Sequence, residues 1–294
     1  MNLNIMKAIN KARALLDNEG VRSSRLEAEM LMTHILGCLR HHLYINRDRL
    51  LTAKESQKYF SLVKKRLKGA PIHYIIGYRE FMGLNFCVNE DVLIPRPDTE
   101  VLVEYIIDYA RDREPYSFRI LDIGTGSGAI AISLAKYIDS SQVIATDIEA
   151  SALLVAKKNA AIHGVDSKVR FVQGDLFSAL EGVGTQFDII VSNPPYIPKD
   201  EMKELEPQVK DYEPIKALDG GEDGLDFYRR LAEGAPDFLL PGGLWAVEVG
   251  YNQAQQVAEI LETAGCYGDI GFIKDLAGYN RVVVAVMSGS GDWD

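Results

Sequence analysis

The residues best placed to do chemistry are Asn193-Pro194-Pro195-Tyr196, which follow an apolar run at 187–192. Two consecutive prolines remove backbone donors and stiffen the segment, so the carbonyl groups of Asn193 and Pro194 are held in fixed directions. A planar amide or amine nitrogen is a poor nucleophile because its lone pair is delocalised. Fixed acceptors for both of its N–H groups would favour the geometry from which that lone pair attacks. The tetrapeptide therefore indicates alkylation of a planar nitrogen.

Each residue of the tetrapeptide has an expected role. The Asn193 side-chain oxygen and the Pro194 carbonyl are the candidate acceptors, and Tyr196 would pack on the flat group and orient it. We expect catalysis through Asn193, Pro194 and Tyr196, by positioning and electrostatics and without a covalent intermediate, and contacts to the substrate from these three and Pro195. The alternative is that the four residues form only a rigid turn that leaves a strand.

A glycine-rich loop at Asp122–Gly128 follows a predicted strand and opens a predicted helix. Glycines at such a place let the backbone turn tightly and approach a ligand closely. The pattern alone does not choose the ligand, because Gly124, Gly126 and Ala129 also fit dinucleotide-binding spacing, and a purely structural turn would need the same glycines. The loop predicts a cofactor site with contacts from Gly124, Thr125, Gly126, Ser127 and Gly128.

Two aspartates at the ends of later strands extend this site. Asp147 lies 23 residues beyond Gly124, where a carboxylate can accept hydrogen bonds from both hydroxyls of an adenosyl ribose. Asp175 follows the third predicted strand, so its carboxylate would accept from the adenine amino group while the Leu176 amide donates to the ring. For Asp175 the alternative is a loop aspartate that caps a turn. Asn193 follows the fourth strand and is also expected to contact the cofactor, so these residues occur in the order that one cofactor cleft requires.

The chain beyond residue 96 alternates short apolar runs with amphipathic segments. Strands are predicted at 120–121, 143–145, 169–172 and 187–191. Such alternation indicates an α/β fold with a doubly wound parallel sheet, in which ligands bind at the carboxyl ends of the strands. The closing part predicts a helix over 225–240, a strand over 244–249, a helix over 252–264, an antiparallel hairpin of strands at 267–273 and 281–287, and a loose tail at 288–291.

Helical spacing of apolar residues dominates the first seventy positions. Capping boxes are predicted for Ser24 with Glu27 and for Thr52 with Glu55. Between residues 74 and 93, aromatic and β-branched residues interspersed with glycines predict a hairpin. We therefore expect three parts: a helical domain at 1–72, a β-hairpin linker at 73–95 and a catalytic domain at 96–294.

Composition excludes several classes of function. The chain has 32 Lys and Arg against 42 Asp and Glu, a net charge of −10, which disfavours a broad grip on a phosphate backbone. The three cysteines lie far apart in the sequence, which suggests neither a disulfide framework nor a cysteine zinc site. Three histidines lie in the N-terminal part, but no carboxylate or cysteine at a suitable spacing completes a metal site with them. The sequence has no signal-peptide pattern and no apolar stretch long enough to span a membrane, so we expect a cytoplasmic protein, a monomer without stably bound nucleic acid.

The ordered set of motifs resembles the class I S-adenosylmethionine-dependent methyltransferases, whose fold is Rossmann-like. Asn193–Tyr196 resembles the tetrapeptide of enzymes that methylate adenine amines and glutamine amides. Three further segments, Val92–Glu100, Ala217–Leu225 and Asp275–Gly278, are similar to segments of the release factor glutamine methyltransferases. This resemblance covers essentially the whole chain.

The resemblance implies an N-terminal helical bundle that recognises the substrate, a hairpin, and a catalytic domain that uses S-adenosylmethionine and yields S-adenosylhomocysteine. It implies that the substrate is the glutamine of the Gly-Gly-Gln loop of class I peptide chain release factors, methylated on the side-chain nitrogen N5. Some relatives carry a tryptophan where this chain has Leu176, so Phe177 or another apolar side chain is expected to cover the adenine.

Three other functions stay open. A nucleic-acid adenine-N6 methyltransferase would present a flipped base to the same acceptors, although the acidic net charge disfavours it. Ribosomal-protein glutamine methyltransferases share the tetrapeptide, but Pro97-Asp98-Thr99-Glu100 favours the release-factor branch. A methyltransferase-like binding module without catalysis is disfavoured by the intact glycine loop and Asn193.

Overall fold

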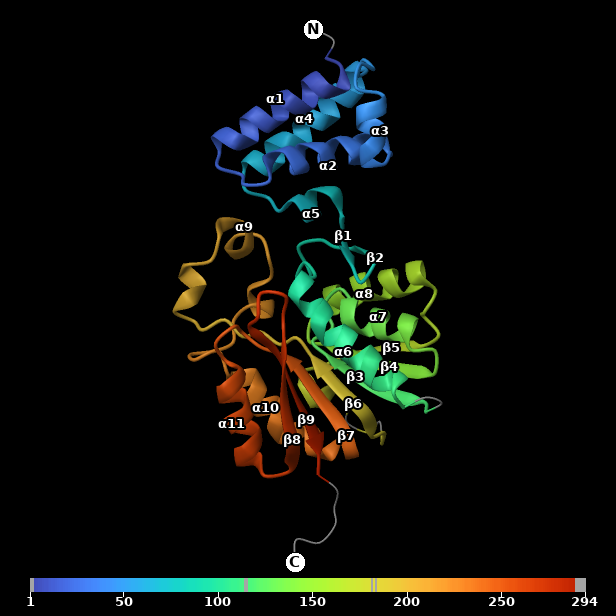
Figure 1. Cartoon of the computed structure of the whole chain (residues 1–294), viewed down its shortest axis with the longest axis vertical. Helices are drawn as coiled ribbons and strands as arrows, with labels where there is room; N and C mark the ends of the chain where they lie inside the picture. Colours follow the sequence, from blue (N-terminus) through green and yellow to red (C-terminus); the bar gives the residue numbers. More distant parts are fainter. Residues whose placement is uncertain (1–2, 114–115, 181, 183, 289–294) are drawn as a thin grey trace, which may run out of the picture. The chain divides into compact units, whose positions relative to one another are not determined.

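The computed structural model describes residues 3–113, 116–180, 182 and 184–288, so the tail expected beyond Ser288 lies outside the described residues. The chain forms two compact units (Figure 1). The first runs to Tyr78 and includes Glu206–Tyr212, and the second holds Arg79–Leu205 and the chain from Glu213 onward.

The second unit is built on a seven-stranded sheet with the order β5-β4-β3-β6-β7-β9-β8. The first five of these strands are parallel, and β9 is antiparallel to both of its neighbours. The predicted doubly wound fold and its edge hairpin are therefore confirmed. The strands are β3 (Phe118–Ile123), β4 (Ser141–Asp147), β5 (Val169–Gln173), β6 (Phe187–Ser192), β7 (Leu239–Glu248), β8 (Tyr267–Lys274) and β9 (Asn280–Met287).

Side chains of the central strands alternate between two apolar cores, one on each face of the sheet. In β6, for example, Ile189 and Val191 belong to one core and Ile190 to the other, as the period of two in a strand requires. Figure 1 shows the helices that cover the two faces on opposite sides of the sheet. One face carries α6 (Glu100–Arg111), α7 (Ala129–Tyr137) and α8 (Ala150–His163), and the other carries α10 (Asp226–Gly234) and α11 (Ala254–Ala264).

Some predicted boundaries were wrong. The helix expected over 225–240 ends at Gly234, and Leu239 already begins β7. Pro236 explains the early stop, because proline has no backbone N–H to continue the helical hydrogen bonds. The predicted hairpin is shorter than 74–93: its strands are β1 (Tyr78–Phe81) and β2 (Leu84–Cys87), and Ile72–Ile76 form a short helix, α5.

The first unit is helical, as predicted. Its longer helices are α1 (Ile5–Asn18), α2 (Ser24–Leu36), α3 (Arg40–Ile45) and α4 (Ala53–Leu67), and the short α9 (Pro207–Lys210) belongs to the same unit. The buried faces of α1, α2 and α4 form one apolar core. Helix packing of this kind stabilises elements that are each too short to be stable alone in water.

One of the two predicted capping boxes is present. The Thr52 side chain and the Glu55 side chain each accept from the other residue's backbone amide at the start of α4. The box predicted for Ser24 and Glu27 is wrong. Ser24 is the first residue of α2, where its hydroxyl donates to Asp17, and Glu27 pairs with the buried Arg66 of α4. Tertiary partners have replaced the local cap.

A buried carboxylate joins α2 to α3. Glu29 is 1% exposed and accepts hydrogen bonds from Arg25, Arg40 and Tyr44. Burial acts to raise the pKa of Glu29, but the hydrogen bonds from Tyr44 and the two guanidinium groups outweigh it, and the pKa is lowered overall. The network therefore stabilises the folded unit while Glu29 is ionised.

Replacing Glu29 by glutamine should loosen α3, because the acceptor loses its charge. The guanidinium partners are half exposed and screened by water, so we expect a cost of about 1–2 kcal/mol. Hydrogen exchange of the α3 amides at neutral pH should then be roughly tenfold faster, with Glu19→Gln on the exposed end of α1 as the control.

The same variant should change the acid response. The pKa of Glu29 is lower in the folded state than in the unfolded state. The ionised carboxylate therefore adds fully to the free energy of unfolding of the wild type above the unfolded-state pKa. This contribution is lost as the pH falls through the folded-state pKa. Urea titrations at a series of acidic pH values should show that the free energy of unfolding falls less steeply with decreasing pH in Glu29→Gln than in wild type. The assigned role would be contradicted if variant and wild type had equal α3 exchange rates and equal pH dependence of the free energy of unfolding.

Candidate active site

Three parallel strands end side by side, and a predicted site residue lies at the end of each of them. Ile123 of β3 is in register with Thr146 of β4 and with Ser192 of β6. The next residues along the chain are therefore Gly124, Asp147 and Asn193. Register alone brings the glycine loop, the acid and the tetrapeptide to one edge of the sheet.

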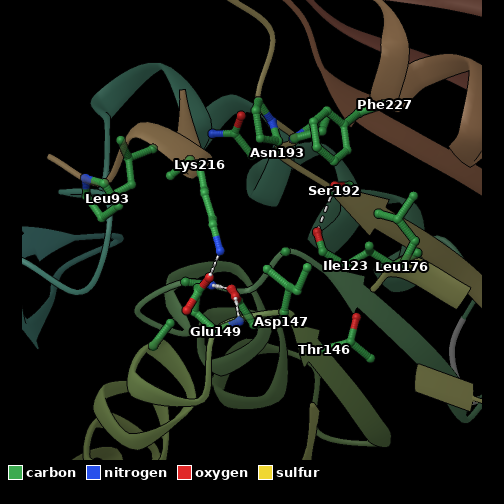
Figure 2. Close-up of a pocket in the computed structure, with 18 of the residues that line it drawn as sticks. Leu93, Ile123, Thr146, Asp147, Glu149, Leu176, Ser192, Asn193, Lys216 and Phe227 are labelled. Carbon is green, nitrogen blue, oxygen red and sulfur yellow. Dashed lines mark hydrogen bonds and ion pairs between the residues drawn. The ribbon is translucent and has the colours of Figure 1, made fainter. Parts of the chain in front are cut away.

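A cavity of about 390 Å³ lies at this edge (Figure 2). The predicted site residues that line it are Gly124, Gly126, Asp147, Asp175, Leu176, Asn193, Pro194 and Pro195. Four others, Thr125, Ser127, Gly128 and Tyr196, do not line it. The structure thus assembles most of the predicted cofactor residues around one hollow and places the rest behind its walls.

The glycine loop depends on two different properties of glycine. Gly124 has φ +74° and faces open space, so it provides the turn into the cavity. Gly128 has φ +82°, and a Cβ there would lie 2.7 Å from Cδ1 of Ile132, so it provides close packing of α7. Behind the loop, the Thr125 hydroxyl donates to the buried Asp122 at 2.6 Å.

Sequence reasoning missed Asn159, a fully buried side chain of α8. Its amide donates to the carbonyls of Ser127 and Cys87, and its oxygen accepts from the Cys87 amide. One side chain therefore ties the glycine loop to strand β2. An asparagine inside a helix gives no signal for this role in a single sequence, because its partners lie more than thirty residues away.

Asp147, the last residue of β4, is held by backbone donors at the wall of the cavity. Its carboxylate accepts from the Gly126 amide at 2.8 Å and from the Glu149 amide at 2.9 Å. Burial raises its pKa, while these hydrogen bonds act in the opposite direction. The carboxylate is thus fixed in orientation on the cavity wall, with acceptor capacity left for ligand hydroxyl groups.

The residues predicted for the adenine are only partly where they were expected. Asp175 lines the cavity but pairs with Arg230 at 2.6 Å. Leu176 also lines it, with an unusual φ of +49°. Phe177 instead stacks on Phe238 in the core, with ring centroids 5.2 Å apart. Phe227 is an aromatic side chain on the cavity wall that sequence reasoning did not identify.

Lys216 was also missed. Figure 2 shows it extending from the Pro214–Ala217 loop to Glu149, beside Asp147, and its ammonium group lies 2.6 Å from the Glu149 carboxylate. Both side chains are well exposed, so this pair contributes little to stability. Its effect is to join two lining segments from different parts of the chain.

The backbone of the tetrapeptide packs closely against a loop that contains two glycines, Gly220 and Gly224. A Cβ on Gly220 would lie 2.7 Å from Cα of Tyr196, and one on Gly224 would lie 2.4 Å from the Tyr196 carbonyl oxygen. The Gln253 side chain donates to that same carbonyl at 2.9 Å. The segment Ala217–Leu225 therefore needs its glycines to lie against the tetrapeptide backbone.

The side chains of the tetrapeptide face different surroundings. Asn193 lines the cavity, and its Nδ2 donates to the Thr99 hydroxyl at 3.0 Å. Tyr196 is half-buried, and its hydroxyl lies 3.4 Å from the Glu248 carboxylate. Burial raises the pKa of Tyr196, so it stays neutral. Its predicted contact with the substrate remains a prediction.

Two family profiles match the chain. The PrmC N-terminal domain matches residues 7–77, and the methyltransferase small domain matches residues 98–206. A release factor glutamine methyltransferase from Geobacter sulfurreducens is 44% identical over 280 residues, which cover 95% of each chain. The chain belongs to the release factor glutamine methyltransferase family. Another member, from Clostridium acetobutylicum, is 42% identical and covers 98% of this chain and 100% of its own.

A solved structure agrees at the level of the fold. The methyltransferase from Pyrococcus furiosus has a TM-score of 0.50 and 22% identity, and the match covers 71% of this chain and 91% of that one. As a member of its family the protein is a methyltransferase, and its methyl donor is S-adenosylmethionine. Within the described residues, no helix is long and apolar enough to cross a membrane.

The charge of the cavity lining fits this donor. Its acidic lining residues outnumber its basic ones, Lys216 and Arg230, and both of these are already paired with lining acids. A net negative wall suits a ligand that carries a sulfonium and an ammonium group.

Behind the glycine loop, Asp122 is fully buried with one carboxylate oxygen that has no hydrogen-bond partner, and burial raises its pKa to about 7.

Asp147→Ala should weaken cofactor binding, because it removes the acceptor expected to hold the ribose hydroxyls. Loss of hydrogen bonds to a charged group costs about 1.5–3 kcal/mol, which corresponds to a dissociation constant raised roughly 10- to 100-fold. Isothermal titration with S-adenosylhomocysteine measures it, and Asp139→Ala, an exposed aspartate before β4, is the control. An unchanged dissociation constant would refute the ribose role.

Proposed function

We propose that the protein methylates the side-chain amide nitrogen N5 of the glutamine in the Gly-Gly-Gln loop of class I peptide chain release factors. The observation that carries this proposal is the placement of Asn193. Its amide nitrogen is engaged by Thr99 while the side chain lines the cavity, so its oxygen is the atom left to accept from a substrate N–H. Membership of the family supports the choice of substrate.

The roles proposed for the tetrapeptide follow from hydrogen-bonding capacity. Asn193 Oδ1 and the Pro194 carbonyl would accept the two N–H groups of the glutamine amide and favour the geometry from which the nitrogen lone pair attacks, with Pro195 completing the wall beside them. Tyr196 would orient the group from the other side. S-adenosylmethionine supplies an electrophilic methyl group on a sulfonium sulfur. The chain therefore contributes fixed acceptors and orientation, and no nucleophile of its own.

The cofactor contacts proposed here are the glycine loop, Gly124–Gly128, the ribose acid Asp147 and the adenine-side residues Asp175 and Leu176. The pairing of Asp175 with Arg230 means that an adenine amino group would share this carboxylate with a guanidinium group. Phe227 and Leu176, which both line the cavity, are the apolar side chains we assign to the adenine.

We further propose that residues 1–72 recognise the body of the release factor, that 73–95 link this domain to the catalytic domain at 96–294, and that the protein acts in the cytoplasm as a monomer. The acidic net charge of −10 supports a protein substrate over a stably bound nucleic acid. Adenine-N6 and ribosomal-protein glutamine methylation remain the alternatives that the first experiment separates.

Incubation of purified class I release factor with the protein and S-adenosylmethionine should add one methyl group to the Gly-Gly-Gln glutamine. Peptide mass spectrometry locates the added mass, and a release factor with that glutamine replaced by alanine is the control. Methyl transfer to RNA, DNA or ribosomal protein instead, with none on the release factor, would overturn the substrate assignment and keep the methyltransferase fold.

Asn193→Ala should lower kcat by about 100-fold or more, because it removes an acceptor for the attacking amide. The dissociation constant for S-adenosylhomocysteine should stay within about threefold, since the glycine loop and Asp147 are intact. Asn85→Ala, an exposed asparagine of β2, is the matched control. If cofactor binding fell as much as turnover, Asn193 would have been assigned to the wrong ligand.

A further inference from the structure

Three side chains from separate segments form a hydrogen-bonded chain that ends at the candidate substrate acceptor. Asn193 Nδ2 donates to Thr99 Oγ1 at 3.0 Å, and Thr99 Oγ1 donates to Glu248 Oε2 at 2.5 Å. Thr99 ends the short turn η1 (Pro97–Thr99), and Glu248 is the last residue of β7. Thr99 is 4% exposed and Glu248 is 1% exposed.

The direction of the hydrogen bonds in this chain is determined by chemistry. Above its pKa the Glu248 carboxylate is ionised and only accepts, so the single hydrogen of the Thr99 hydroxyl is directed to Glu248. The Thr99 oxygen is then available only as an acceptor toward Asn193. The Asn193 atom that faces Thr99 must therefore be the NH2 group, and the amide oxygen must point away from Thr99.

We infer that Thr99 and Glu248 are positioning residues that fix the side-chain amide of Asn193, so that its oxygen rather than its NH2 group faces the substrate nitrogen. The inference deepens the proposed function and rests on it. An asparagine without this chain could rotate by half a turn at little cost, because its oxygen and NH2 group have nearly the same shape. The rotated form would offer donors to a substrate that also donates.

The surroundings of Glu248 favour this directing role over an ion pair. The charge of Arg281 acts on Glu248, but Arg281 is paired with Asp275 at 3.1 Å and with Asp98 at 3.4 Å. Burial raises the pKa of Glu248 to about 7, against the hydrogen bond from Thr99 and the charge of Arg281. Above about pH 7 the carboxylate is therefore ionised, and it accepts from the Thr99 hydroxyl in the geometry described above.

The test compares two substitutions at Thr99. Thr99→Val keeps the branched shape and removes the hydroxyl, whereas Thr99→Ser keeps the hydroxyl and removes a methyl group. With purified release factor as substrate, we expect Thr99→Val to lower kcat roughly tenfold or more, with KM and the dissociation constant for S-adenosylhomocysteine within about threefold of wild type. Thr99→Ser should stay within about threefold of wild type in all three.

A double-mutant cycle isolates the route through Asn193. If Thr99 acts by orienting Asn193, Thr99→Val should cause no further loss of kcat in an Asn193→Ala background. Glu248→Gln provides a second entry to the same chain, because a glutamine can donate as well as accept and so permits both orientations of Asn193. We expect its kcat to fall severalfold, again with unchanged cofactor affinity.

Several outcomes would overturn the inference. Thr99→Val with wild-type kcat would do so, as would equal losses in Thr99→Val and Thr99→Ser, which would indicate a packing role. Additive losses in the double mutant would show that Thr99 does not act through Asn193. If Thr99→Val does not fold, Glu248→Gln with wild-type kcat overturns the inference instead. A wild type that transfers no methyl to glutamine overturns both the proposed function and the inference, whereas an active wild type with unaffected variants overturns only the latter.

Discussion

The parallel register of β3 with β4 and β6 is the constraint on which the site depends. Because Ile123 is level with both Thr146 and Ser192, the glycine loop, Asp147 and Asn193 start from one line across the sheet. A shift of one residue in any of these strands would turn buried side chains to the opposite core. The two apolar cores thus fix the register, and the register fixes the site.

The main features of this arrangement could be predicted from the sequence, because they depend on local patterns. Apolar runs followed by Gly124, Asp147 and Asn193 indicate strands that end at a ligand, and the order of the motifs indicates one cleft. The Thr52 and Glu55 cap was predictable for the same reason, since both partners lie within one turn. Local signals were unreliable where a distant partner competed, as it did for Ser24 and Glu27.

Residues that support the site from a distance could not be found in this way. Thr99, Asn159 and Glu248 act through partners between 32 and 149 positions away. Their residue types are common in helices and strands, and although Thr99 lies in a segment that resembles the family, nothing in their spacing identifies their partners. The sequence also could not show that Phe227 rather than Phe177 lines the cavity, because both are phenylalanines in the catalytic part of the chain. The difference comes from packing: Phe177 stacks on Phe238, whereas Phe227 lies on the cavity wall.

The segment Glu206–Tyr212 belongs to the helical unit although it lies between the tetrapeptide and the glycines at 220 and 224. Gln208 contacts Arg66, and the Tyr212 hydroxyl donates to the Lys68 carbonyl. The backbone therefore passes between the units three times, and the two later passages lie between Tyr196 and the glycines that hold it. A fragment that begins near residue 78 would contain Glu206–Tyr212 but lack the helices that this segment packs with. The helical unit is thus built from two separate stretches of the chain, and the second stretch is an insertion in the sequence of the other unit.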